Sequence, residues 1–452
     1  DAPISEAGWT TEKFFLLRDL LKNYLPAGES LPEVPAALPV IEIPEIHFNK
    51  VAPLFSNLPE AKQTVDIQSM EQFNQGWGTI LYRTTLPEAT PAGTVLKITE
   101  VHDWAQIYAD GKLLARLDRR KGEFTTTLPA LKKGTQLDIL VEAMGRVNFD
   151  KSIHDRKGIT EKVELVSGNQ AKELKNWAVY NFPVDYSFIK DKKYNDTKIL
   201  PAMPAYYKST FKLDKVGDTF LDMSTWGKGM VWVNGHAMGR FWEIGPQQTL
   251  FMPGCWLKEG ENEILILDLK GPAKASIKGL RKPILDVLRE KAPETHRKDG
   301  EKLKLTGEKV GHEGAFTPGN GWQEVRFATP VKGRYFCLEA LSPQANDNIA
   351  AIAEFDVLGA DGKPVSREHW KIRYADSEET RSGNRTADKI FDLQESTFWM
   401  TVDNVPYPHQ LVIDLSKVET VTGFRYLPRA EKEYPGMIKE YRVYVKSADF
   451  NY

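Results

Sequence analysis

The sequence predicts a mainly β protein built from consecutive β-sandwiches, and three observations support this. Short runs of alternating apolar and polar residues are separated by turn dipeptides such as Asp110-Gly111 and Asn234-Gly235. No long helical periodicity occurs between residues 73 and 269. Aromatic residues, which suit pleated sheets, make up 11% of the chain.

Length and composition set the number of domains and exclude some partners. The chain has 452 residues, which predicts about three domains of roughly 150 residues each. The formal net charge of −2 gives no electrostatic reason to expect a nucleic acid partner. No apolar run approaches the roughly 18 residues of a membrane span. Two cysteines, Cys255 and Cys337, fall in different expected domains and exclude a disulfide framework.

The first 53 residues predict one amphipathic helix and an extended strap. Thr10 is the expected N-cap, and Pro26 ends the helix. Apolar residues recur between them at helical spacing: Phe14, Leu17, Leu21 and Tyr24. The proline-rich strap follows to Pro53. A lone helix before a strap is typical of the end of a preceding domain, and the alternative is a helix packed on the sandwiches.

The segments 82–142 and 207–269 repeat one pattern. Each contains a strand pair closed by an Asp-Gly or Asn-Gly turn. A buried strand then follows a Lys-Gly or Glu-Gly turn. The repeat predicts two successive sandwiches of one type.

Charged residues become frequent between residues 270 and 304, which indicates a linker with a helix around residues 280–291. A third domain follows. The expected divisions of the chain are 1–53 (helix and strap), 54–170 (first sandwich), 171–270 (second sandwich), 271–304 (linker) and 305–452 (third sandwich).

The run from Gly229 to Trp242, GMVWVNGHAMGRFW, continues through GPQQTLFMP at residues 245–253. It closely resembles a segment of glycoside hydrolase family 35 β-galactosidases, where it belongs to a galactose-binding-like jelly roll. The runs 102–104, 145–148 and 157–159 are similar to the preceding sandwich of those enzymes. Residues 1–24 look like the last loop and closing helix of their catalytic (β/α)8 barrel.

This resemblance implies that the intact protein removes terminal β-galactosyl residues with retention, using two glutamates on barrel strands. Those glutamates are expected upstream of Asp1, so no catalytic residue is assigned and the chain alone is predicted to be inactive. Asn262-Glu263 imitates the family's acid/base dipeptide but enters a sandwich strand, which indicates a structural role. The expected partners are β-galactoside-containing glycans and the barrel of the same polypeptide. No cofactor is required, and an extracytoplasmic location, periplasmic or secreted, is expected.

The C-terminal region resembles a different family. Residues 370–447 look like the first half of a discoidin-like domain, the coagulation-factor C-type sandwich, and residues 322–359 match its second half. The halves are swapped in order, which predicts one circularly permuted sandwich over 305–452. Permutation is physically cheap where the native termini of a domain lie close together.

Discoidin-like sugar binders often hold a structural calcium ion. The positions that match this pattern are Asp392, Thr397 and Glu354, whose oxygen atoms are the hard ligands that calcium prefers. Leu393 and Gln394 replace the Gly-Asp of the pattern. The alternative is a solvated turn.

Other candidate residues favour structural roles. His102 and Asp103 are neighbours without a placed nucleophile, which is weak support for catalysis. Trp232, Trp242 and Trp256 are expected to be sandwich core or packing toward a barrel rather than sugar platforms.

Taken together, these patterns predict the accessory β-sandwich portion of a retaining exo-acting β-galactosidase. The alternatives are a stand-alone carbohydrate-binding protein without hydrolase activity and a structural spacer that binds nothing.

Overall fold

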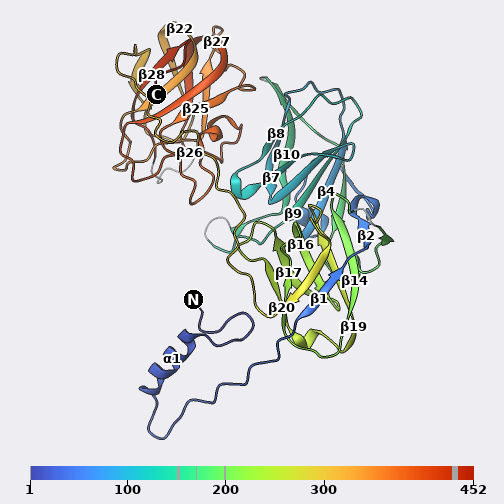
Figure 1. Ribbon diagram of the computed structural model, residues 1–452. Coiled ribbons are helices and arrows are strands. Elements are labelled where there is room, and N and C mark those ends of the chain that lie inside the picture. The colour runs from blue at the N-terminus through green and yellow to red at the C-terminus, as the bar shows by residue number, and fades with distance from the viewer. Residues whose placement is uncertain (1, 150–152, 169, 198–199, 430–435) are drawn as a thin grey trace. The chain divides into compact units, whose positions relative to one another are not determined.

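The computed structural model describes residues 2–149, 153–168, 170–197, 200–429 and 436–452 (Figure 1). The chain forms two compact units. One combines residues up to 60 with residues 183–291, and the other combines residues 61–182 with residues 292–452. Strands dominate both units, so the predicted mainly β class is confirmed.

The first sandwich pairs a six-stranded sheet with a four-stranded sheet. The six-stranded order is β3-β12-β4-β9-β6-β7, and the four-stranded order is β11-β10-β5-β8. The strands are β3 (Lys62–Thr64), β4 (Gly78–Thr85), β5 (Val95–His102), β6 (Trp104–Ala109), β7 (Lys112–Asp118), β8 (Thr125–Thr127), β9 (Gln136–Ala143), β10 (Gly158–Ser167), β11 (Gln170–Glu173) and β12 (Trp177–Phe182). The inward side chains of both sheets form one apolar core, as the alternation of a sandwich requires.

The second sandwich has the same two-sheet construction. Its six-stranded order is β13-β2-β14-β19-β16-β17, and its four-stranded order is β1-β20-β15-β18. The strands are β1 (Ile43–His47), β2 (Lys50–Pro53), β13 (Asn195–Asp196), β14 (Ala205–Leu213), β15 (Thr219–Asp222), β16 (Lys228–Val233), β17 (His236–Trp242), β18 (Thr249–Met252), β19 (Gly260–Asp268) and β20 (Ser276–Leu280). The end of the proline-rich strap supplies β1 and β2, so this segment is part of the second sandwich.

The predicted internal repeat is confirmed by strand order. The order β4-β9-β6-β7 in the first sandwich matches β14-β19-β16-β17 in the second, and β10-β5-β8 matches β20-β15-β18. The hairpin turns also match. Asp110 and Gly111 have φ of 47° and 79°, and Asn234 and Gly235 have φ of 48° and 86°. A two-residue type I′ turn needs positive φ at both positions, which Asn-Gly and Asp-Gly adopt readily.

The third sandwich is one domain built from both predicted halves. Its main sheet has the order β21-β28-β22-β27-β24, with β25 also paired to β27, and β23 pairs with β26. The strands are β21 (His312–Ala315), β22 (Gln323–Ala340), β23 (Ala351–Ile352), β24 (Glu354–Leu358), β25 (Lys371–Ala375), β26 (Trp399–Met400), β27 (His409–Leu427) and β28 (Glu440–Lys446). Strands β22 and β24 from the earlier half pair with β27 from the later half. This is the pairing that a permuted sandwich requires.

The helix predicted around residues 280–291 is wrong. Among these residues β20 ends at Leu280, and the chain then runs without a helix. Val287 N donates to Pro246 O at 3.0 Å, and Arg289 N donates to Ile244 O at 2.8 Å. The backbone therefore pairs with a distant segment, and this non-local pairing replaces the local helical bonds that the leucine spacing favoured.

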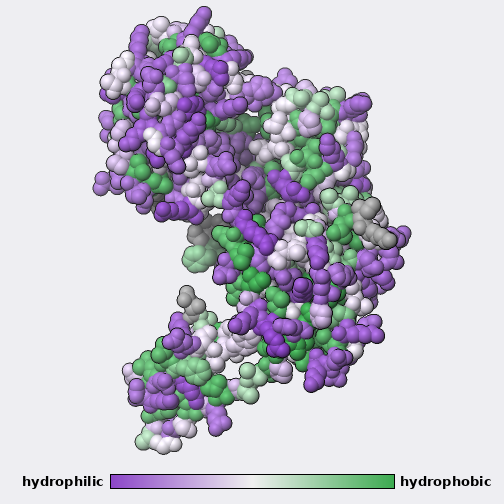
Figure 2. Space-filling view, in the orientation of Figure 1, coloured by the Kyte–Doolittle hydropathy of each residue, from purple (hydrophilic) through white to green (hydrophobic). Residues whose placement is uncertain are grey.

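Helix α1 (Glu12–Lys22) is confirmed, with Thr11 rather than Thr10 at the N-cap. None of its residues is buried, and its surface mixes exposed apolar and charged side chains (Figure 2). The alternative of a helix buried on the sandwiches is therefore wrong. The other α-helix, α2 (Tyr186–Ile189), is a single turn. Among the described residues, no helix is both long enough and apolar enough to cross a membrane.

Candidate functional site

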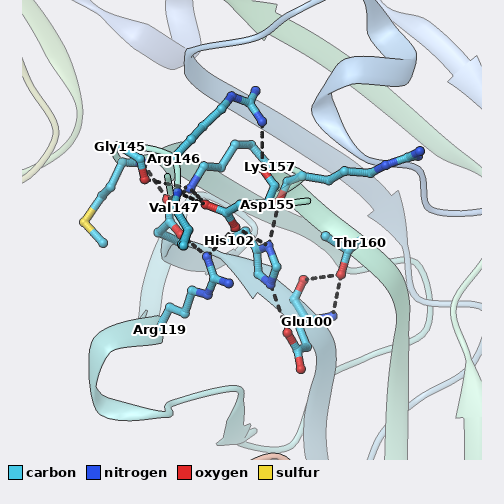
Figure 3. Close-up of polar contacts among 12 residues, drawn as sticks. Glu100, His102, Arg119, Gly145, Arg146, Val147, Asp155, Lys157 and Thr160 are labelled. Atoms are coloured by element: carbon cyan, nitrogen blue, oxygen red, sulfur yellow. Dashed lines mark hydrogen bonds and ion pairs between the residues drawn. The ribbon is translucent and has the colours of Figure 1, made fainter. Parts of the chain in front are cut away.

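A buried network of charged side chains lies in the first sandwich, where β5 passes into β6 (Figure 3). His102 ends β5, Asp103 follows it, and Asp155 and Lys157 immediately precede β10. Lys157 Nζ donates to Asp103 Oδ2 and to Asp155 Oδ2, each at 2.7 Å. The Lys157 side chain is fully buried. A buried ammonium is tolerated only when it is paired and hydrogen-bonded, and two carboxylates meet that need here.

Arg119 completes the network. It begins the short 3-10 helix Arg119–Lys121, which follows β7. Its Nη1 lies 2.8 Å from Asp103 Oδ1 and 2.7 Å from Asp155 Oδ1. Each carboxylate therefore contacts both cations, and two negative charges balance two positive charges. This closed arrangement compensates the cost of burying Asp103, Asp155 and Lys157, while Arg119 keeps 27% of its side chain exposed.

His102 belongs to the edge of the network. Its Nδ1 lies 2.6 Å from Arg156 O, and its Nε2 lies 2.9 Å from Glu100 Oε2. The hydrogen bond from His102 is the largest cause that lowers the pKa of Glu100. The adjacent pair His102-Asp103 thus divides between two sets of partners, and neither residue holds a nucleophile for the other.

The electrostatics of the network do not suit glycoside hydrolysis. Burial raises the pKa of Asp155, but hydrogen bonds from Lys157 and Arg119 outweigh it and lower the pKa to about 2. A retaining glycosidase needs one carboxyl that holds a proton and one carboxylate free to attack. Asp103 and Asp155 are both held by cations, so the network has a structural role.

That role is to anchor the segment 144–157. Met144 N donates to Asp103 Oδ2 at 2.7 Å, and Val147 N donates to Asp155 Oδ2 at 3.1 Å. Arg146 donates to the carbonyls of Asp155 and Gly76, each at 2.7 Å. The two ends of the segment are therefore held together at its base.

Beyond this base, the segment exposes apolar side chains. Phe149 is 81% exposed, and Val147 and Ile153 are also exposed. Trp77, next to Gly76 at the anchor point, is 49% exposed. We call Trp77, Val147, Phe149 and Ile153 the apolar loop surface. Large exposed apolar side chains on and beside one anchored segment make it a candidate interaction surface.

The structure brings two of the three predicted calcium residues together. Thr397 Oγ1 donates a hydrogen bond to the carboxylate of Asp392. It lies 2.9 Å from Oδ1 and 2.8 Å from Oδ2 of that side chain. Glu354 contacts the guanidinium of Arg367, and it lies near enough to Asp392 for the charge of that carboxylate to contribute to its raised pKa. Burial raises the pKa of Asp392 to about 7 and that of Glu354 to about 8. Among the described residues, no group of three or more His, Cys, Asp or Glu is placed to hold a metal ion, and the calcium site stays a prediction.

Asn262 and Glu263 occupy structural positions, as their location at a turn predicts. Asn262 is fully buried, and its Nδ2 donates to Lys258 O at 2.8 Å. Its Oδ1 accepts from Asn234 Nδ2 at 2.8 Å, which ties two hairpins together. Glu263 pairs with Lys208 at 2.6 Å.

The three tryptophans of the second sandwich have different environments. Trp232 is buried in the core. The ring of Trp242 lies 4.0 Å from Lys228 Nζ in a cation–π contact. Trp256 is exposed and stacks on His236 at 4.7 Å, so a core position is wrong for this residue.

Sequence reasoning missed the partners of Asp103. Arg119 and Asp155 are distant from it in sequence and stand in charged runs that predict only surface loops. The sequence offered one signal, which is that the charged run Asp155-Arg156-Lys157 stands directly before a predicted strand. The structure buries two of its three charged side chains, Asp155 and Lys157.

Comparison with known proteins gives matches over all three sandwiches. The model for the first all-beta domain of β-galactosidase matches residues 68–183, and the model for its galactose-binding domain matches residues 204–262. The F5/8 type C domain model matches residues 374–452, the later half of the third sandwich.

Curated relatives agree with these matches. The β-galactosidase of Bos taurus is 32% identical over 334 residues, which is 66% of this chain and 49% of that protein. The human β-galactosidase is 32% identical over 301 residues, covering 60% of this chain and 43% of that protein. That of Xanthomonas manihotis is 33% identical over 253 residues, covering 56% and 40%. The chain spans less than half the length of these relatives.

The two domain matches identify the first two sandwiches with accessory domains of β-galactosidase homologues. The chain carries the first all-beta domain and the galactose-binding domain of β-galactosidases, followed by an F5/8 type C domain.

Proposed function

We propose that this chain is the accessory β-sandwich portion of a retaining, exo-acting β-galactosidase. The observation that carries the proposal is the succession of two β-galactosidase domain matches, at residues 68–183 and 204–262, in one chain. The curated β-galactosidases that match are about twice as long as the matched part. A catalytic (β/α)8 barrel in the same polypeptide would supply the two glutamates, and the chain alone would be inactive.

Two exposed apolar features suit contact with such a barrel. One is the apolar loop surface, whose base is fixed by the Lys157 network. The other is α1, where Leu16, Leu20 and Leu21 are exposed. The described base of the segment is already held by hydrogen bonds, so it loses little conformational entropy when the surface docks, and this favours binding.

The third sandwich is the candidate glycan-binding part. The F5/8 type C match supports this role, and Asp392, Thr397 and Glu354 are the residues proposed for a structural calcium ion. β-Galactoside-containing glycans are the proposed ligands. The proposed location is extracytoplasmic, where such glycans are available.

Hydrolysis of a chromogenic aryl β-galactoside tests the function. The chain, purified from a host that lacks β-galactosidase, should give no turnover, whereas the polypeptide that also carries the barrel should be active. Turnover that co-purifies with the chain would place catalytic carboxylates within these residues and contradict the proposal. Glycan binding by a longer polypeptide that never hydrolyses would favour the stand-alone carbohydrate-binding protein.

A further inference from the structure

A cleft of about 710 Å³ lies within the compact unit of residues 61–182 and 292–452, between its two sandwiches. Thr125–Thr127 of β8 and Gln170 of β11 line it from the first sandwich. Asp356 of β24, the segment 363–368 and Arg425 of β27 line it from the third. Ligand sites commonly have volumes of about 300–1,000 Å³, so the cleft has room for a short oligosaccharide.

Direct contacts join the two walls of this cleft. Asn384 Nδ2 donates to Lys121 O at 3.1 Å, and Lys389 Nζ donates to Gly122 O at 3.2 Å. Gly122 has φ of 61°, and a Cβ atom there would lie 2.8 Å from Thr397 Cγ2. The turn after β7 therefore fits against the third sandwich only because residue 122 is glycine.

The charges that line the cleft balance. Asp356, Glu368 and Asp392 are matched by Lys363, Arg367 and Arg425. Arg367 Nε and Arg425 Nε each lie 2.9 Å from a carboxylate oxygen of Asp356, so these charges are already paired. Positive and negative side chains are equal in number in this lining, and three of the six pair with one another, which favours a neutral ligand over a strongly charged one.

Hydrogen-bonding groups remain for such a ligand. A guanidinium has five N–H donors, and Arg425 directs two of its nitrogen atoms at Asp356. The indole N–H of Trp370, which also lines the cleft, is buried and has no hydrogen-bond partner among the described residues. Phe391, 5.9 Å from Trp370, adds apolar surface.

We propose that this cleft binds a neutral β-galactosyl oligosaccharide, with one wall supplied by each sandwich. The threonine hydroxyls of β8 and the remaining N–H groups of Arg425 would meet sugar hydroxyls, and Trp370 and Phe391 would contact the apolar faces of the sugar rings. The choice of a β-galactosyl chain rests on the proposed function, whereas a neutral polyhydroxylated ligand follows from the cleft itself. Such a site holds a glycan without cleaving it.

Calorimetric titration of the whole chain with a β-linked galactotetraose tests the proposal. The exposed residues Thr127 and Ser366 line opposite walls, so Thr127→Arg and Ser366→Arg each place a bulky cation in the cleft without disturbing a core. The matched controls are Thr85→Arg at an exposed strand end of the first sandwich and Ser382→Arg on the third sandwich. We expect each cleft variant to weaken binding at least tenfold and each control to leave Kd unchanged.

Three results would overturn the proposal. The first is no binding by the parent chain at millimolar sugar. The second is binding that survives both cleft variants. The third is loss with Ser366→Arg alone, which would assign the sugar to the third sandwich by itself. The assay contains no hydrolysis step, so failure of the proposed function would appear separately, in the turnover assay.

Discussion

Lys157 Nζ lies 2.7 Å from Asp103 Oδ2, although the two residues are 54 positions apart in the sequence. The bond joins the segment before β10 to the crossing from β5 to β6, and so links the two sheets of the first sandwich. The ammonium nitrogen of Lys157 is surrounded by oxygen acceptors: carboxylate oxygens of Asp103 and Asp155 at 2.7 Å, and Gly145 O at 3.1 Å. The position therefore needs an ammonium group.

Replacement of this lysine tests the network. Lys157→Met keeps the approximate volume but removes the ammonium group that both Asp103 and Asp155 contact, and Arg119 remains as the cation shared by the two carboxylates. Removing one partner of a buried ionic cluster costs about 3–5 kcal/mol. We expect the amide hydrogens of β10 to exchange faster, by the factor that corresponds to this loss of free energy. Mass spectrometry measures the exchange rate. Lys162→Met is the control, because Lys162 pairs with Glu164 at the surface and should cost less than about 1 kcal/mol. Equal protection in both variants would contradict the structural role.

The third sandwich should lose stability as pH rises. Burial lowers the pKa of His409, but the hydrogen bond to Asp376 outweighs it and the net pKa is raised. Stability from His409 is therefore present below its unfolded pKa of about 6.5 and is lost as pH rises through the folded value. Glu354 has the same sign, because burial raises its folded pKa to about 8, above that of an exposed glutamate, and the native state holds a proton that the unfolded chain releases.

Calorimetric unfolding between pH 5 and pH 8.5 measures this trend. The transition of the third sandwich should move to lower temperature as pH rises. Glu354→Gln, which imitates the protonated side chain, should flatten the slope. A transition temperature that rises over this interval would contradict the assignment of raised pKa values to His409 and Glu354.

The apolar loop surface should matter for docking and little for folding. Phe149→Ser removes an exposed ring, so the free energy of unfolding of this chain should change by no more than about 0.5 kcal/mol. In the polypeptide that carries the barrel, the same change should shorten the half-life of thermal inactivation. Val418→Ser, at an exposed valine of the third sandwich, is the matched control. Equal half-lives for both variants would remove the loop from the docking surface.

The calcium prediction has a direct test. Millimolar calcium should raise the unfolding temperature of the third sandwich, because a ligand that binds only the folded state stabilises it. Asp392→Asn should abolish the increase by removing a charged oxygen ligand. An unchanged temperature with calcium would assign Asp392 and Thr397 to the alternative of a solvated turn, held by their own hydrogen bonds.

Local patterns predicted much of the fold because their physics is local. Asp110-Gly111 and Asn234-Gly235 require positive φ at both positions, which few other pairs adopt, so the hairpins and the repeat could be recognised from sequence. The helix expected at residues 280–291 failed for the opposite reason. Its leucine spacing is local, whereas the bond from Val287 N to Pro246 O that decides its structure is not.

The sequence by itself determined the class of the fold, the tandem repeat, the two-part third sandwich and the likeness to β-galactosidase accessory domains. Only the tertiary structure decided which charges are buried together and what they do. Asp103, Arg119, Asp155 and Lys157 come from three separate segments, and their structural role depends on distances of about 3 Å between their charged atoms. Sequence spacing carries no information about such distances, because they are set by how the two sheets pack.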